Sequence, residues 1–315
     1  MTEKMKGSLA LLLASVIWGS GFVAAKIGSG TMSFFSFNGM RFLAAVLILL
    51  PFAVRDIGRT GYFSQKENGY ELARVRRIRT VTGSLVCGIL LAGGINLQQA
   101  GLGLCSAGRS GFITILYVII VPVMGVVVGK RPGARLWICV AVAVAGFALL
   151  SLKGGSHGIS TGDILLLISA VVYSFQIVAL NHYVTANSGV ILSFGQLVVC
   201  GALSLVLGAV FDGYTLEAVR ASILPILYTA VFPTAIGFSF QTIGQEKVPP
   251  AVASLIMSLE GAFAAVFGVL ILHESMTQRE LLGCLLIFAS VMVAQLPTKE
   301  ERDQEKSARK VSEGR

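Results

Sequence analysis

Two charged residues stand inside long apolar stretches of this sequence. Arg41 lies within "FFSFNGMRFLAAVLILL" and Glu260 lies within "ASLIMSLEGAFAAVFGVLIL". If these stretches belong to membrane helices over 34–54 and 251–272, the helical rise places Arg41 ~12 Å and Glu260 ~15 Å from the start of its helix. A charge at such depth costs at least ~2.5–3.5 kcal/mol on insertion scales, so each side chain is expected to face protein, water or a ligand.

The chemistry open to these two residues is recognition of charge and transfer of a proton. Arg41 suits the binding of an anionic group or an ion pair with Glu260. The structural alternative is a guanidinium that reaches outward or bonds the carbonyls at a helix end. Glu260 suits proton coupling if its carboxyl exchanges a proton at mid-depth. A gating or packing carboxyl and direct contact with a substrate are the alternatives, and the sequence leaves all of them open.

Uncharged polar and aromatic residues in similar stretches complete the set of candidates. The expected substrate-binding residues are Trp18, Arg41, Asn96, Gln99, Tyr117, Tyr173, Gln176, Gln196, Tyr228 and Glu260. Asn96 and Gln99 are three residues apart, so they share one face of a helix. Thr234 and Gln241 add hydrogen-bonding groups to the segment that holds Tyr228.

The elements that must position these residues are membrane-spanning helices. The chain has 315 residues, of which 55% are hydrophobic and 13% are charged, and its mean hydropathy is +0.80. A soluble domain has about a quarter charged residues. We therefore predict an all-α polytopic membrane protein. Ten apolar spans, each long enough to cross ~30 Å of hydrocarbon, lie near 7–27, 34–54, 80–102, 107–128, 134–152, 162–184, 189–211, 221–243, 251–272 and 279–297.

The distribution of lysine and arginine predicts the orientation in the membrane. With the N-terminus in the cytoplasm, nineteen of the 25 Lys and Arg residues fall on the cytoplasmic side and five on the other. Short cytoplasmic loops are enriched in these residues, so both termini are expected to be cytoplasmic. The net charge of +9 is thus a topology signal, and no nucleic-acid partner is expected. Residues 55–79 are expected to form a basic cytoplasmic loop and residues 298–315 a disordered charged tail.

The two halves of the sequence resemble each other. A shift of 155 places the first span on the sixth, with Trp18 on Tyr173, and places Arg41 on Gln196. A shift of 144 places the fourth and fifth spans on the ninth and tenth, with no carboxylate in the first half to match Glu260. Trp18 and Tyr173 are suited to clamp an apolar or aromatic group, and packing between helices explains them equally well.

Five spans per half is an odd number, so the second half must insert upside down relative to the first. We predict a first five-helix repeat over residues 1–152 and a second, inverted repeat over residues 153–297. Inverted repeats are typical of secondary transporters, which bind their substrate near the midplane between the repeats.

Several segments resemble one family of membrane proteins. They are "WGSGFVAAK" in the first span, "FNGMRFLAA" in the second, "SAGRSGFITILYVIIVPVMGVVVGKRPG" in the fourth and "VASLIMSLEGAFAAVFGVLILHE" in the ninth. With ten spans as five plus five, they resemble the EamA-like members of the drug/metabolite transporter superfamily over residues 7–297. The resemblance implies a permease, commonly an exporter of amino acids, other metabolites or drugs, with a central cavity. A proline often follows the glutamate of the ninth span in this family, whereas Gly261 stands here.

The expected function is secondary transport of small metabolites across the inner membrane by alternating access. The alternative is a membrane-embedded enzyme that acts on a lipid or isoprenoid. Such an enzyme would need clustered acidic or His residues at a membrane face. The nearest candidates, Asp212 with Glu217 and Glu274 with Glu280, are sparse.

No cofactor and no metal are expected. The five cysteines and three histidines are scattered, and the glycine-rich pieces lack the GK[ST] ending of a phosphate loop. The expected partners are a small-molecule substrate and the lipid bilayer, with the protein as a monomer or homodimer. The GxxxG motif "GVVVG" at 125–129 fits close packing within one chain or a dimer interface.

Overall fold

The computed structural model describes an all-helical protein. It describes residues 2–28, 30, 32–60, 62–64, 69–105, 107–129, 132–151, 160–184, 188–272 and 277–295, and there is no strand among them. The helices are α1 (Glu3–Gly28), α2 (Phe34–Thr60), α4 (Tyr70–Leu104), α5 (Ala107–Thr114), α6 (Tyr117–Val127), α7 (Ala134–Ser151), α8 (Thr161–Val184), α9 (Gly189–Leu207), α10 (Leu216–Ala221), α11 (Ile223–Thr229), α12 (Phe238–Gln245), α13 (Pro250–Met257), α14 (Leu259–Leu272) and α15 (Gln278–Gln295), with π-helices η1 (Gly208–Asp212) and η2 (Ala230–Gly237). The predicted tail at 298–315 lies outside the described residues.

Seven segments are long and apolar enough to cross a membrane. They are Glu3–Gly28, Phe34–Thr60, Tyr70–Leu104, Thr161–Val184, Gly189–Asp212, Ile223–Gln245 and Pro250–Ile271. Three further apolar helices are shorter, at Tyr117–Val127, Ala134–Gly146 and Leu281–Ala294. The all-α polytopic fold is therefore confirmed, while the count of ten spans stays a prediction.

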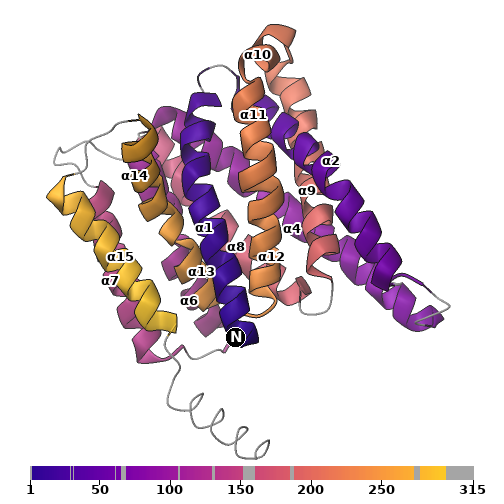
Figure 1. Ribbon diagram of the computed structural model, residues 1–315, viewed down its shortest axis with the longest axis horizontal. Helices are drawn as coiled ribbons and strands as arrows, with labels where there is room; N and C mark the ends of the chain where they lie inside the picture. The colour runs from indigo at the N-terminus through magenta and orange to yellow at the C-terminus, as the bar shows by residue number, and fades with distance from the viewer. Residues whose placement is uncertain are drawn as a thin grey trace, which may run out of the picture.

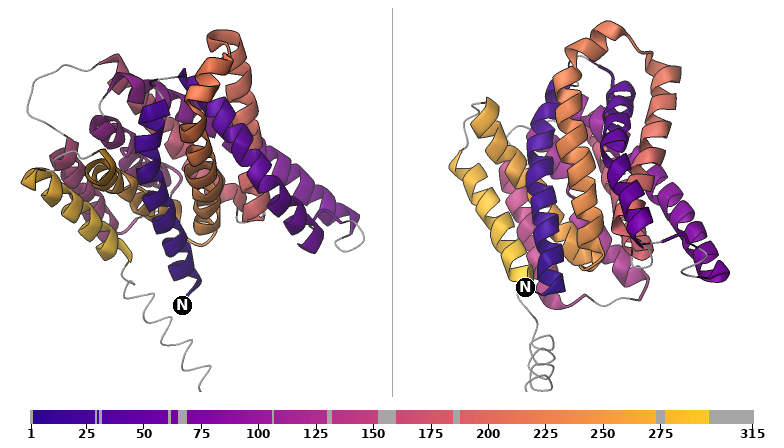
Figure 2. Two further views of the ribbon diagram at one scale, coloured as in Figure 1. Left: turned by 45° about the horizontal axis from the view of Figure 1, so that its top comes forward. Right: turned by 45° about the vertical axis from the view of Figure 1, so that its right-hand side comes forward.

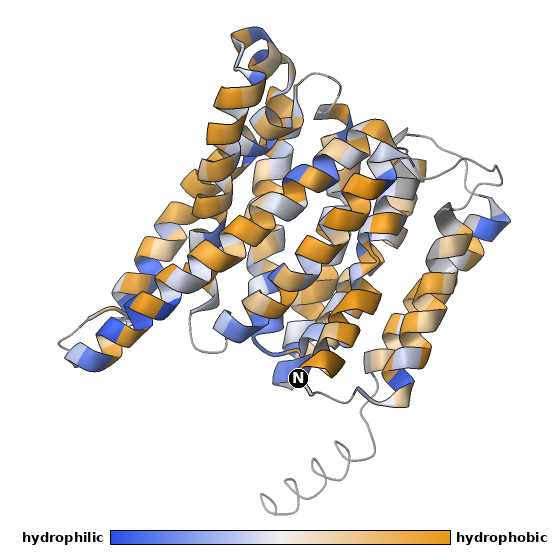
Figure 3. Ribbon diagram, turned by 180° about the vertical axis from the view of Figure 1, so that it is seen from behind, coloured by the Kyte–Doolittle hydropathy of each residue, from blue (hydrophilic) through white to orange (hydrophobic). Residues whose placement is uncertain are grey.

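The outer surface of the bundle is apolar, as a bilayer requires. Leu224, Ile138 and Leu47 are 76%, 64% and 62% exposed. Figure 3 shows hydrophobic residues along the outward faces of the long helices. In water such a surface would drive aggregation, whereas lipid tails satisfy it.

The most extensive helix pairs join the first half of the chain to the second. α1 packs against α14, α2 against α9, α4 against α8, and α7 against α15. Figures 1 and 2 show α1 running between the α13–α14 segment and the column formed by α11 and α12. Any space at the centre of the bundle is therefore walled by both halves.

Close approach between these helices depends on glycine. A Cβ on Gly19 would lie 2.5 Å from Phe263 Cβ and 2.9 Å from the backbone nitrogen of Ala264 in α14. A Cβ on Gly244 of α12 would lie 2.5 Å from Leu11 Cγ in α1. Small residues let the backbones of membrane helices approach closely. Here Gly19 and Gly244 allow α1 to pack against α14 and α12.

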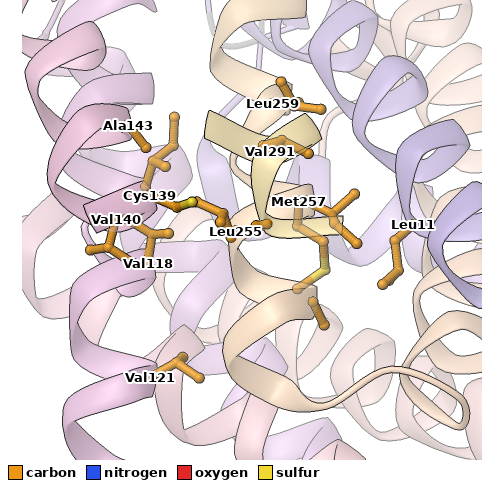
Figure 4. Packing of buried hydrophobic residues seen from close by; sticks show 14 of the residues in the cluster. Leu11, Val118, Val121, Cys139, Val140, Ala143, Leu255, Met257, Leu259 and Val291 are labelled. Carbon is orange, nitrogen blue, oxygen red and sulfur yellow. The ribbon is translucent and has the colours of Figure 1, made fainter. Parts of the chain in front are cut away.

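A buried apolar cluster holds the ends of the two halves together. It includes Leu11 of α1, Val118 of α6, Cys139 of α7, and Leu255 and Met257 of α13. Figure 4 shows these side chains pointing toward one another from several helices. Cys139 is 2% exposed and is a packing residue.

Two of the membrane segments are broken near the middle. One segment turns at Ile115–Leu116 between α5 and α6, and the other turns at Ser258 between α13 and α14. The Ser258 hydroxyl donates to the carbonyl of Leu255 (2.7 Å), which helps to satisfy the interrupted backbone. No proline follows Glu260, so the interruption occurs without one.

The prediction of a loop over residues 55–79 is wrong for most of its length. α2 continues to Thr60 and α4 begins at Tyr70, and the two helices project together from the bundle (Figure 1). The polar end of this projection is visible in Figure 3. Arg76 lies over the ring of Tyr62 at 5.0 Å, so part of the basic charge packs on the connection itself.

Candidate functional site

A cavity between the two halves contains Arg41 and Glu260. It leaves about 80 Å³ for the centres of water-sized molecules, several times what a single water needs. Its walls come from α1, α2, α4, α6, α8, η2, α12, α13 and α14. The lining residues are Trp18, Gly21, Phe22, Ala25, Arg41, Ile95, Gln98, Gln99, Leu102, Tyr117, Tyr173, Gln176, Ile177, Pro233, Thr234, Phe238, Gln241, Met257 and Glu260.

Seven of the ten residues that the sequence nominated line this cavity. They are Trp18, Arg41, Gln99, Tyr117, Tyr173, Gln176 and Glu260. Their segments are far apart in the chain, so the folded arrangement brings them together. Their role in binding stays a prediction, because position alone does not test it.

The other three nominated residues lie elsewhere. Asn96 accepts a hydrogen bond from Asn38 (2.9 Å) and donates to Ser204 (2.9 Å), so it joins α4 to α2 and α9. Tyr228 is 37% exposed, with its hydroxyl 2.7 Å from that of Ser20. Gln196 is fully buried and is treated with its partners below.

Arg41 is buried against aromatic rings. It is 5% exposed, and its guanidinium carbon lies 5.8 Å from the ring centroid of Phe37 and 5.2 Å from that of Phe42. Among the described residues its Nε has no hydrogen-bond partner. Arg41 therefore does not reach outward, and cation–π contacts hold its side chain in place.

Glu260 occupies the first turn of α14, directly after the break at Ser258. It is 6% exposed, and its Oε1 accepts a hydrogen bond from the hydroxyl of Tyr117 at 3.2 Å. Tyr117 is the first residue of α6, so the bond joins the two broken segments. Discontinuous helices of this kind position polar groups at the substrate sites of transporters.

Arg41 and Glu260 form no ion pair with each other, although both are described and both line the cavity. The hypothesis of a direct pair is wrong in this structure. Tyr173, whose side chain ends in a hydroxyl, lines the same cavity. The same hydroxyl donates to Gln98 Oε1 at 3.2 Å.

Trp18 is held at the cavity wall by a hydrogen bond to a π-helical segment. Its indole Nε1 donates to the carbonyl of Pro233 at 2.9 Å, and Pro233 lies within the π-helix η2. The ring partner of Trp18 is Phe238, at 5.3 Å between centroids. The aromatic wall is thus built from Trp18 with Phe238, and Phe238 was not nominated from the sequence.

Three further polar residues, Gln98, Thr234 and Gln241, line the cavity and were not among the ten nominated from the sequence. Gln98 stands beside the nominated Gln99, and Thr234 and Gln241 stand in a span whose polar groups were visible. The missing signal was helical phase: η2 has a π-helical pitch, so spacing rules for an α-helix misplace its side chains. No group of three or more potential metal ligands occurs in the part of the chain that the structure covers.

Comparison with known proteins decides the class of molecule. The sequence matches the EamA-like transporter family over residues 5–152 and again over residues 160–295. The chain belongs to the EamA-like transporter family. It is accordingly a membrane transporter, and its relatives include proteins named as inner membrane transporters.

Three relatives illustrate the similarity. An uncharacterized transporter of Archaeoglobus fulgidus is 32% identical over 295 residues, covering 93% of this chain and 87% of the relative. The inner membrane transporter YedA of Escherichia coli is 24% identical over 296 residues, covering 90% and 89%. The threonine/homoserine exporter RhtA of Salmonella typhimurium is 29% identical over 173 residues, covering 55% and 58%.

A solved crystal structure shares the fold. It superimposes with a TM-score of 0.71 at 18% sequence identity and covers 95% of this chain and 98% of that chain. At that identity the likeness concerns the arrangement of helices alone.

Proposed function

We propose that this protein is a secondary transporter of small zwitterionic metabolites, with amino acids as the first class to test. One observation carries the proposal: a basic side chain, Arg41, and an acidic one, Glu260, line one cavity and do not bond each other. A ligand with a carboxylate and an ammonium group would satisfy both at once.

The energetics favour such a ligand. A charge without a partner inside the membrane costs at least ~2.5–3.5 kcal/mol on insertion scales. A ligand carboxylate can form two parallel hydrogen bonds with the planar Arg41 guanidinium. The partner of Glu260 in the structure is the neutral hydroxyl of Tyr117. A ligand ammonium would give Glu260 a positively charged partner.

The relatives support the same class of cargo and favour export. RhtA is named a threonine/homoserine exporter, and its similarity covers 55% of this chain. The aromatic wall of Trp18 and Phe238 would then contact the apolar part of the cargo.

Alternating access follows from the proposed inverted repeats. α13 begins 143 residues after α5 (250 − 107), and α14 begins 142 residues after α6 (259 − 117). Both breaks therefore recur at nearly the shift of 144 residues that aligns the two halves of the sequence. Broken helices at matched positions support two repeats that move against each other around a central site. In the proposed topology both termini are in the cytoplasm.

The test is flux into liposomes without ATP. Purified wild-type protein is expected to transport L-threonine, while N-acetyl-L-threonine and L-threonine methyl ester, each lacking one charge, are transported at least about tenfold less well. Arg41→Gln and Glu260→Gln should each lower L-threonine flux by a similar factor, and Arg220→Gln, an exposed arginine of α10 outside the cavity, should leave it unchanged. Equal flux of all three compounds would exclude recognition of a zwitterion.

A further inference from the structure

Behind one wall of the cavity, four polar side chains form a continuous chain of hydrogen bonds. The Thr242 hydroxyl donates to the Phe238 carbonyl at 2.8 Å. Gln196 Nε2 donates to Thr242 Oγ1 at 3.4 Å, and Gln176 Nε2 donates to Gln196 Oε1 at 3.1 Å. Gln241 Nε2 donates to Gln176 Oε1 at 3.3 Å. The chain thus joins α12, α9 and α8 and returns to α12.

The direction of this chain is fixed at its first member. A hydroxyl has one hydrogen, and the Thr242 hydrogen goes to a backbone carbonyl that can only accept. Thr242 Oγ1 must therefore accept from the next residue, so Gln196 presents its NH₂ group to Thr242 and its oxygen to Gln176. The same constraint orients Gln176, and then Gln241.

The last member of the chain is left with an acceptor. Gln241 is 3% exposed and lines the cavity, and no described residue donates to its Oε1. Thr234, in the preceding π-helix η2, is fully buried and also lines the cavity. Its Oγ1 likewise has no hydrogen-bond partner among the described residues. Buried polar atoms in proteins are nearly always paired, so these two atoms, which belong to residues lining the cavity, are candidates for a partner that enters it.

We propose that Gln241 and Thr234 form a subsite that recognises a hydrogen-bond donor, such as a hydroxyl, on the side chain of the cargo. This inference rests on the proposed function, since Arg41 and Glu260 are taken to hold the two charges of the same cargo. A cargo with an apolar side chain of equal size would leave Gln241 Oε1 unpaired. The cost of an unpaired buried polar atom gives a site its strongest discrimination against such a cargo.

Thr242 does not line the cavity and acts as a positioning residue. Its hydroxyl sets the direction of the chain, and without it Gln196, Gln176 and Gln241 can turn over together. Gln241 would then present its NH₂ group to the cavity, and the preference for a donor on the cargo would weaken or reverse.

The first experiment measures discrimination rather than activity alone. Liposomes containing wild-type protein are expected to transport L-threonine about tenfold better than L-2-aminobutyrate, which lacks only the hydroxyl. Gln241→Met should bring this ratio close to one. Gln245→Met is the matched control: Gln245 lies one helical turn further along α12 and outside the cavity lining, so this variant should keep the wild-type ratio.

The second experiment tests the chain itself. Thr242→Val should lower the ratio of L-threonine to L-2-aminobutyrate flux below the wild-type ratio. Thr242→Ser keeps the hydroxyl and should therefore keep the wild-type ratio. A role of Thr242 in packing alone predicts the opposite order, because valine conserves the volume and serine does not.

The outcomes separate the two proposals. Equal flux of both amino acids in the wild-type protein would overturn the subsite and leave the zwitterion proposal standing, and so would an unchanged ratio in a folded Gln241→Met variant. Flux of neither amino acid in the wild-type protein would overturn the proposed function and the subsite with it. The wild-type ratio decides the matter even if Gln241→Met does not fold.

Discussion

At the scale of single residues, Arg41 and Glu260 line one cavity and do not bond each other. Arg41 packs against the rings of Phe37 and Phe42, and Glu260 accepts a hydrogen bond from Tyr117. Their separation creates two poles in one cavity. If the proposed cargo binds here, its ammonium group and a proton would compete for the Glu260 carboxylate, and this competition would couple proton movement to transport.

Glu260→Gln tests that link. The amide keeps the shape and can still accept from Tyr117, but it cannot bind or release a proton. We expect that transport by the variant no longer responds to a pH gradient across the liposome membrane, whereas transport by the wild-type protein does. The measurement is L-threonine flux with and without an imposed gradient. A variant that responds to the gradient as strongly as the wild-type protein would show that Glu260 has a packing or gating role.

At the scale of elements, interrupted helices and glycine contacts set the site. The breaks at Ile115–Leu116 and Ser258 place Tyr117 and Glu260 at the starts of α6 and α14, where their side chains meet. Gly19 keeps α1 close to α14, the helix that carries Glu260. The geometry of the cavity therefore depends on backbone features that are remote from its polar groups.

Gly19→Ala should destabilise the protein by about 1–3 kcal/mol, because the added Cβ meets backbone atoms that cannot rotate away. Thermal unfolding in detergent should give a Tm for Gly19→Ala that is several degrees below the wild-type Tm. Gly103→Ala is the control: Gly103 also lies in a helix, and a Cβ there would meet no atom within 4 Å. Equal Tm values for the two variants would contradict the close packing of α1 on α14.

At the scale of the whole molecule, the halves are interleaved and the surface is a membrane surface. The main helix pairs each join one half to the other, so movement of one half against the other must change the cavity. The excess of lysine and arginine on one side predicts how this body sits in the bilayer.

Labelling from outside the cell tests that orientation. In a background in which the native cysteines are replaced, a membrane-impermeant maleimide should label Arg220→Cys in intact cells and should label Lys4→Cys only after the cells are opened. Residue 4 lies at the start of α1, on the proposed cytoplasmic side. Residue 220 is exposed on α10, on the proposed outer side. Labelling of Lys4→Cys in intact cells would reverse the proposed topology.

The sequence by itself determined the class of the protein and nominated seven of the residues that line the cavity. Long apolar segments have few folded states open to them in a bilayer, so composition and length predict membrane helices. A charge or amide inside such a segment must face the interior, which is why Arg41, Gln176 and Glu260 could be nominated.

Only the tertiary structure decided which interior polar groups face the cavity and which are bonded to one another. Asn96 and Gln99 share a helix face, yet Asn96 bonds Asn38 and Ser204 while Gln99 lines the cavity. Gln241 donates to Gln176 on α8, and the π-helix η2 precedes it in its own segment. Such partners lie tens to hundreds of positions apart in the chain, and no local pattern encodes the distance at which they meet.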